Sequence, residues 1–165
     1  MTTRLDFDAI WTHVLAAHAH DPDSIHGPDH WRRVEENGRR LAARTGADEE
    51  IVRLFAIFHD SKRVNDGTDP DHGQRGASYA VQLHGQLFRI APDRLVQLIY
   101  ACTWHTDRKH SDDPTIGTCW DADRLDLTRL GILPSPKYMS TAYGKVLAGE
   151  FSRALRSRAR RHSRS

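Results

Sequence analysis

Cysteine is scarce in this chain of 165 residues, and long apolar runs are missing. Cys102 and Cys119 are the two cysteines, and no CxxC pair occurs, so a thiolate metal site and a disulfide scaffold are both excluded. No apolar stretch approaches the roughly 20 residues that span a bilayer, and the amino terminus has no apolar signal region. These absences predict a cytoplasmic protein without a membrane anchor, with both thiols reduced.

Alternating strand patterns are also missing, whereas helical periodicity extends over most of the chain. The pattern predicts a first helix containing Ile10, Trp11 and Val14 and a second over about 28–45 that ends at Gly46. Further helices are expected from Asp48 to about residue 60, over roughly 73–90, 92–105 and 115–130, and from about Ser140 onward. The fold class is therefore all-α, a compact single-domain helical bundle.

Positive charge is concentrated at the carboxyl terminus. The formal net charge is +2, and the segment "FSRALRSRARRHSRS" contains six arginines and no acid. Residues 1–150 therefore carry a net charge of −4 and residues 151–165 form a basic tail. Such a tail can bind nucleic acid or another anionic surface, or it can be the solvated end of a helix.

Eleven histidines are present, and several interrupt apolar stretches. The run "FAIFHD" leads from Phe55 to His59 and Asp60, at a position where a core is expected. A carboxylate removed from water needs a partner such as a cation. His30 shares a helix face with Val34, and Asp123 lies three residues after Trp120, so both side chains are predicted to point inward. Two imidazoles and two carboxylates suit a divalent transition metal.

The order of these groups resembles the HD-domain superfamily of metal-dependent phosphohydrolases. The resemblance rests on "HWRRV", "FHD" and "DADRLD", and it covers residues 26–130. It implies an HD-type metal-binding helical domain over residues 1–150, with His30, His59, Asp60 and Asp123 as the ligands of one ion.

Two further stretches resemble the binuclear branches of that superfamily, which include cyclic-dinucleotide phosphodiesterases and myo-inositol oxygenase. "HGQRGASYA" and "YACTWH" imply that His72 and His105 hold a second ion, with Asp60 bridging the two. His110 is an alternative to His105. The GYP stretch of the cyclic-dinucleotide enzymes is missing, which argues against a cyclic dinucleotide as substrate.

The cofactor implied is one or two divalent ions of Mn, Fe, Co, Ni or Zn. A metal with an open position activates water and polarises a phosphoryl oxygen, and the substrate then needs a cation. Arg63, Lys62 and Arg75 are the candidates, because arginine binds phosphate in a bidentate manner. Each of the arginines could instead pair with a nearby aspartate. Asp126 is expected to orient a ligand histidine, although Arg124 could neutralise it instead.

The function predicted is a metal-dependent phosphohydrolase, a phosphomonoesterase or phosphodiesterase, acting on a small phosphorylated molecule, which could be a nucleotide. The alternatives are a di-iron oxygenase of the myo-inositol oxygenase type and a non-catalytic module that binds a metal or nucleotide. Nucleic-acid binding by the arginine tail is a fourth hypothesis. Neither substrate identity nor oligomeric state follows from the sequence.

Overall fold

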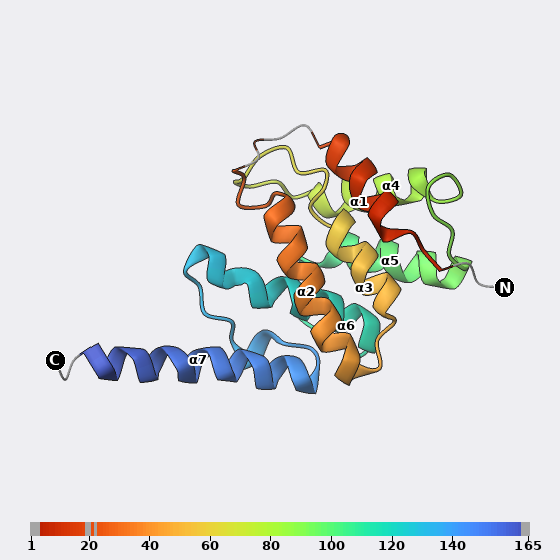
Figure 1. The fold of residues 1–165 in the computed structure, drawn as a ribbon. Coiled ribbons are helices and arrows are strands. Elements are labelled where there is room, and N and C mark those ends of the chain that lie inside the picture. Colours follow the sequence, from red (N-terminus) through yellow and green to blue (C-terminus); the bar gives the residue numbers. More distant parts are fainter. Residues whose placement is uncertain (1–3, 19–20, 22, 163–165) are drawn as a thin grey trace.

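The computed structural model describes residues 4–18, 21 and 23–162, with side chains omitted at 159, 161 and 162. Seven helices form within these residues, and they are arranged as a bundle (Figure 1). Their bounds are α1 Phe7–Ala16, α2 Pro28–Thr45, α3 Glu49–Phe58, α4 His72–Leu83, α5 Pro92–Trp104, α6 Pro114–Leu125 and α7 Ala142–His162. Two short 3-10 helices, Asp126–Leu130 and Pro136–Tyr138, lie between α6 and α7. The described part of the chain contains no strand, and the all-α prediction is confirmed.

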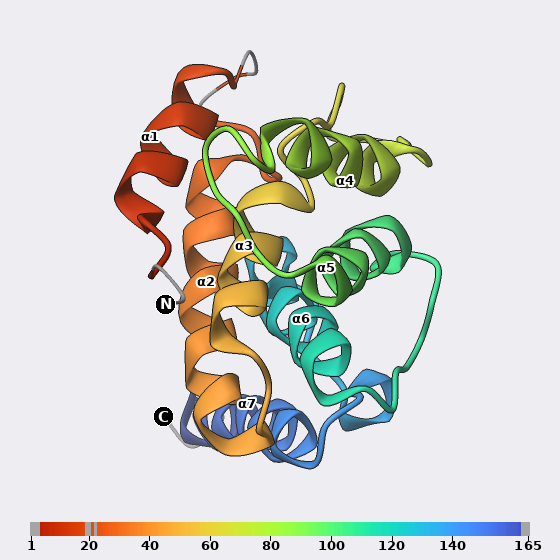
Figure 2. The same ribbon diagram turned by 90° about the vertical axis from the view of Figure 1, so that its right-hand side faces the viewer.

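Helix α3 is the centre of the bundle. Figure 2 shows α3 between α2 on one side and α5 and α6 on the other. Every residue from Leu54 to Phe58 is fully buried, as are Ile51 and Val52. A helix that is apolar on all sides is stable only inside a protein, where other helices cover each face. The apolar run that precedes His59 therefore carries this histidine and Asp60 into the interior.

Helix boundaries follow the capping signals of the sequence. Pro28 is the first residue of α2, and Gly46 ends this helix in the left-handed region with φ 75°. The carboxylate of Asp48 accepts hydrogen bonds from the backbone N–H groups of Glu50 and Ile51 and so caps α3. These positions agree with the predicted bounds.

Two helices are shorter than predicted. Helix α4 ends at Leu83 instead of near residue 90, because Gly85 has φ 87° and reverses the chain. The His84 imidazole then contacts the backbone N–H of Ile90 through Nε2, which fixes the returning segment. Helix α6 ends at Leu125, and the expected extension to Leu130 is a 3-10 helix.

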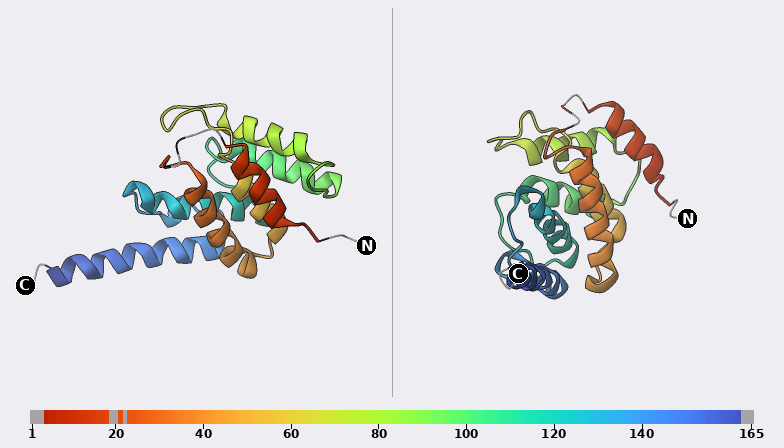
Figure 3. Two further views of the ribbon diagram at one scale, coloured as in Figure 1. Left: turned by 45° about the horizontal axis from the view of Figure 1, so that its top comes forward. Right: turned by 60° about the vertical axis from the view of Figure 1, so that its left-hand side comes forward.

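Helix α7 crosses the expected boundary between residues 150 and 151 without a break. Its carboxyl-terminal half extends beyond the other helices (Figures 1 and 3). Residues 151–162 thus form the end of a helix that is exposed at residues 153–158, whereas residues 163–165 lie outside the described part. The separation of residues 1–150 as a domain stays a prediction. None of the described helices combines the length and apolar character needed to cross a lipid bilayer.

Candidate metal centre

All six predicted ligands converge at one place, although they come from five helices. His30 lies in the first turn of α2 and Asp123 near the end of α6, while His72 is the first residue of α4. His59 and Asp60 directly follow α3, and His105 directly follows α5. The four histidines and Asp60 are buried, and the Asp123 side chain is 21% exposed.

A first group of ligand atoms surrounds the Nε2 atom of His30. This atom lies 3.1 Å from His59 Nε2, 3.2 Å from Asp123 Oδ1 and 3.6 Å from Asp60 Oδ2. His59 Nε2 in turn lies 3.7 Å from Asp60 Oδ2 and 3.8 Å from Asp123 Oδ1. The four predicted ligands of the first ion therefore face a common point.

A second group lies on the other side of the Asp60 carboxylate. Asp60 Oδ1 is 3.3 Å from His72 Nε2 and 3.5 Å from His105 Nε2, and these two nitrogens are 3.0 Å apart. One oxygen of Asp60 thus faces each histidine pair, as a carboxylate that bridges two ions would. His110 is remote from this arrangement, because it is exposed and contacts the carbonyl of Lys137.

Hydrogen bonds fix the tautomer of each histidine. The Nδ1 atoms of His59, His72 and His105 lie against the backbone carbonyls of Phe55 and Ala56, of Asp69 and of Cys102, respectively. Carbonyl oxygens only accept hydrogen bonds, so these Nδ1 atoms carry the proton, and Nε2 keeps its lone pair in the neutral ring. When the rings are neutral, nitrogen lone pairs face each other at about 3 Å in both groups, which is unfavourable unless a proton or a metal cation lies between them.

Charge and burial make this cavity attractive to cations. Burial lowers the pKa of His59 to about 4, so its ring is neutral at physiological pH. Burial alone would raise the pKa of Asp60, but nearby His59 and His105 and the hydrogen bond from His26 hold it well below its usual value. Asp60 Oδ1 is buried and has no hydrogen-bond partner. An ionised, unpartnered oxygen at this depth is costly without a cation.

The donor atoms fit divalent transition ions. Ligands at about 2.1 Å from an ion lie roughly 3.0–3.4 Å from each other in octahedral or tetrahedral geometry. The nitrogen and oxygen atoms that face each other are separated by 3.0 to 3.8 Å. Imidazole and carboxylate together suit Mn, Fe, Co, Ni and Zn. These distances, together with the Asp60 oxygen that accepts no hydrogen bond, show that the residues fit a divalent ion.

Two glycines of α4 allow the second group to form. A Cβ atom at Gly76 would collide with the backbone carbonyl of Phe58, and one at Gly73 with the carbonyl of Cys102. Helix α4 therefore lies directly against the ends of α3 and α5. This close approach brings His72 beside His105 and Asp60.

Asp126 contacts His30, one of the six candidate ligands. Its Oδ2 atom accepts a hydrogen bond of 2.7 Å from Nδ1 of His30, and its Oδ1 atom accepts one of 2.7 Å from Nε of Arg33. Arg33 therefore takes the place expected of Arg124, whose guanidinium donates to the backbone carbonyls of Arg108, Lys109 and Tyr138. The hydrogen bond between Asp126 and His30 orients the His30 ring toward the cluster.

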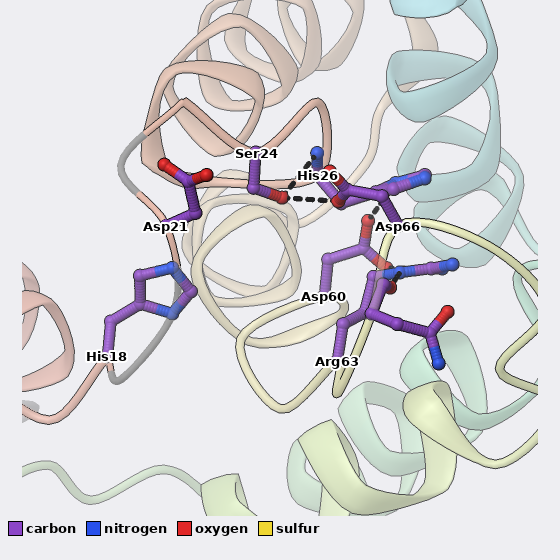
Figure 4. A pocket seen from close by; sticks show the side chains of 8 residues that line it. His18, Asp21, Ser24, His26, Asp60, Arg63 and Asp66 are labelled. Atoms are coloured by element: carbon purple, nitrogen blue, oxygen red, sulfur yellow. Dashed lines mark hydrogen bonds and ion pairs between the residues drawn. The ribbon is translucent and has the colours of Figure 1, made fainter.

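His26 is a member of the cluster that the sequence did not reveal. Its Nδ1 atom donates to Asp60 Oδ2 at 3.0 Å, and the two side chains lie together in Figure 4. His26 lies in the loop before α2, where helical spacing gives no information about direction. The loop is held by a hydrogen bond from Ser24 to Asp66, which joins it to the loop after α3.

The three basic side chains that were predicted to bind the substrate lie in different surroundings. Arg63 lies beside the cluster, with Nη1 3.8 Å from Asp60 Oδ1. Lys62 is directed away from the cluster and lies over the ring of Tyr79 at 3.8 Å. Arg75 pairs with Asp69, whose two oxygens are each 2.6 Å from Nη2. Neither Lys62 nor Arg75 therefore reaches the six ligands, and their predicted role there has no support from their positions.

A pocket of about 450 Å³ opens over the cluster. Its walls include His26, Asp60, His72, His105 and Asp123 together with Arg63, Arg124 and Arg129. Pro70, Leu127 and Leu130 supply an apolar part of the lining. A smaller pocket of about 200 Å³, drawn in Figure 4, shares His26, Asp60 and Arg63 with it. Asp60 thus lines both pockets.

No known family model and no curated protein sequence matches the chain. Among solved structures, it is similar to a predicted HD superfamily hydrolase from an uncultured Thermotogales bacterium. The two share 24% sequence identity over 96% of this chain and 92% of that chain, with a TM-score of 0.74. The chain has an HD-domain fold. The predicted fold class is confirmed, while the two-ion ligand set stays a prediction that rests on the geometry above.

Proposed function

We propose that this protein is a metal-dependent phosphohydrolase that acts on a small phosphorylated molecule. The observation that carries the proposal is the position of Asp60 between two histidine pairs. His30, His59 and Asp123 would hold one ion with Asp60 Oδ2, and His72 and His105 would hold the other with Asp60 Oδ1. When bound, such ions supply a Lewis acid for the phosphoryl oxygens and activate water for hydrolysis.

Arg63 is the side chain best placed to bind the phosphoryl group. Its Nε atom donates to the carbonyl of Asn65 and its Nη2 atom to the carbonyl of Gly67, which leaves Nη1 toward Asp60. A guanidinium held in this way needs little reorganisation when it meets an anion. Arg63 therefore supplies a preorganised positive charge at the edge of the cluster.

The pocket sets the size of the substrate. A volume of about 450 Å³ suits a small molecule and is too small for a folded protein substrate. The apolar wall of Pro70, Leu127 and Leu130 can contact the leaving group while the phosphate lies over the cluster. This combination favours an organic phosphate ester.

The test combines metal content with turnover. Protein purified without chelator should contain two divalent ions per chain, and Mn or Co should stimulate phosphate release from a panel of small phosphate esters. Asp60→Asn should lose both the ions and the activity. Asp112→Asn is the matched control, because Asp112 is an exposed aspartate outside the cluster, and it should retain both.

Two results would overturn the proposal. Two irons per chain with substrate-dependent oxygen uptake and no phosphate release would establish the oxygenase alternative. Metal binding without turnover of any substrate, together with partner binding that survives His59→Ala, would establish a non-catalytic module.

A further inference from the structure

A second pocket, of about 590 Å³, lies next to the metal centre. It is bordered by Lys62, Arg63, Arg75, Ser78, Tyr79 and Gln82. Arg63 lines this pocket and the pocket over the cluster, so its side chain separates the two. The pocket is formed by the segment after α3, by one face of α4 and by Ala17 at the end of α1, and none of the six candidate ligands lines it.

The three basic side chains of this pocket differ in whether a carboxylate lies close enough to balance their charge. Arg75 has a close carboxylate partner in Asp69, and its Nε atom donates to the carbonyl of Lys62. Arg63 is held mainly by carbonyl oxygens, and the carboxylate of Asp60 lies 3.8 Å from its Nη1 atom, beyond hydrogen-bond distance. Lys62 has no carboxylate within ion-pair distance among the described residues. Two positive charges thus remain without a dedicated counter-charge.

Tyr79 gives an independent indication of a missing ligand. Its side chain is 9% exposed, and its hydroxyl is buried without a hydrogen-bond partner. The ammonium of Lys62 lies 3.8 Å above its ring, so the unsatisfied hydroxyl belongs to a residue that lines the pocket together with Lys62. A buried hydroxyl without a partner is unfavourable, and it is satisfied when an acceptor binds.

We propose that this pocket is a second anion site that binds a phosphate-like oxyanion between Lys62, Arg63 and Tyr79. Tetrahedral oxyanions accept hydrogen bonds from ammonium, guanidinium and hydroxyl groups at once, and the residues that carry these three donors line this pocket. The site uses none of the metal ligands. Its existence therefore does not depend on the hydrolase activity proposed above.

The test is the stoichiometry of phosphate binding to the full-length protein, measured by equilibrium dialysis with radiolabelled inorganic phosphate. The protein as purified should bind two phosphates, one at the metal centre and one at the second site. Chelator treatment should abolish the first and Lys62→Gln the second. Lys137→Gln is the matched control, because Lys137 also faces a tyrosine ring, that of the exposed Tyr138, outside the pocket.

Tyr79→Phe keeps the ring under Lys62 and removes only the hydroxyl, so it should weaken the second phosphate about fivefold without loss of helical content. Unchanged phosphate binding in both Lys62→Gln and Tyr79→Phe would overturn the second site. Phosphate binding that resists chelator but is lost in Lys62→Gln would contradict the metal centre and leave the second site intact.

Inorganic tripolyphosphate distinguishes the two sources of the anion. If the second site receives another phosphoryl group of the same ligand, tripolyphosphate should bind more tightly than phosphate, and either chelator or Lys62→Gln should remove this advantage. Equal affinities for tripolyphosphate and phosphate would assign the site to a separate anion. Either result supports the site. Tighter binding of tripolyphosphate identifies the anion as part of the same ligand, and equal affinities identify it as a separate anion.

Discussion

The substitution Gly76→Ala should remove the second ion selectively. A Cβ atom at this position would overlap the carbonyl oxygen of Phe58 and lie 3.0 Å from the carbonyl oxygen of His59 and 3.2 Å from the carbonyl carbon of Phe58. All three atoms belong to the backbone that ends α3, so no side chain can rotate away. Helix α4 must therefore move outward, by about 1 Å, to restore ordinary contact distances.

Such a shift is large compared with the tolerance of a metal site. His72 Nε2 lies 3.3 Å from Asp60 Oδ1, and ligand distances must hold within about 0.2 Å. The ion held by His72 and His105 should be lost, whereas His30, His59 and Asp123 do not belong to α4 and should keep theirs. Overpacking costs about 1–3 kcal/mol, and the helical preference of alanine returns at most about 1 kcal/mol. With the full return, the net effect should be a loss of up to about 2 kcal/mol in the free energy of unfolding.

Elemental analysis and urea unfolding measure both effects. Gly149→Ala is the matched control, because it lies in α7 and its Cβ would meet nothing closer than 3.7 Å. This control should keep two ions and be equally or slightly more stable. Two ions and unchanged stability in Gly76→Ala would refute the argument that close approach of α4 builds the second group.

Three further predictions test the cluster, the fold and the tail. His105→Ala should lose one of two ions while His110→Ala keeps both, as measured by elemental analysis, and equal losses would transfer the role to His110. Burial raises the pKa of Asp48, but hydrogen bonds from Arg94 and from the start of α3 lower it by a larger amount. The net shift of the Asp48 pKa is therefore downward. Asp48→Asn keeps an oxygen that can cap α3 but loses the ion pair with Arg94, so it should cost at most about 1 kcal/mol in the free energy of unfolding at pH 7. That difference should shrink as the pH falls below about 4, because the stabilisation is present above the unfolded pKa and is lost through the folded one; a difference constant with pH would contradict it. Deleting residues 151–165 should abolish any nucleic-acid binding that weakens steeply with salt, and salt-insensitive binding would exclude the arginine tail as its cause.

The sequence predicts those features of the site that depend on helix position. His30 and Asp123 lie on faces marked by apolar neighbours, and His59 follows an apolar run, so periodicity and burial are sufficient to place them inward. Asp126 could be found in the same way, because it lies three residues after Asp123. The apolar residues of the chain itself define the buried helix faces, and they are sufficient to predict that these side chains point inward.

Residues in loops escape this kind of prediction. His26 precedes α2, and its direction depends on contacts such as Ser24 with Asp66 that join loops distant in the sequence. Lys62 and Arg63 are neighbours in the segment after α3, yet one faces Tyr79 and the other Asp60. Arg75 lies in α4, one turn from His72, and even there its direction is set by the ion pair with Asp69 and not by helical spacing. Packing and ion pairing decide these orientations, and neither has a periodic signature.

Anomalous diffraction from crystals grown with Mn tests the central claim most directly. The account predicts two peaks per chain, one between His30, His59 and Asp123 and one between His72 and His105, with a different oxygen of Asp60 on each. A single peak away from Asp60, or no peak at the cluster despite saturating Mn, would contradict it.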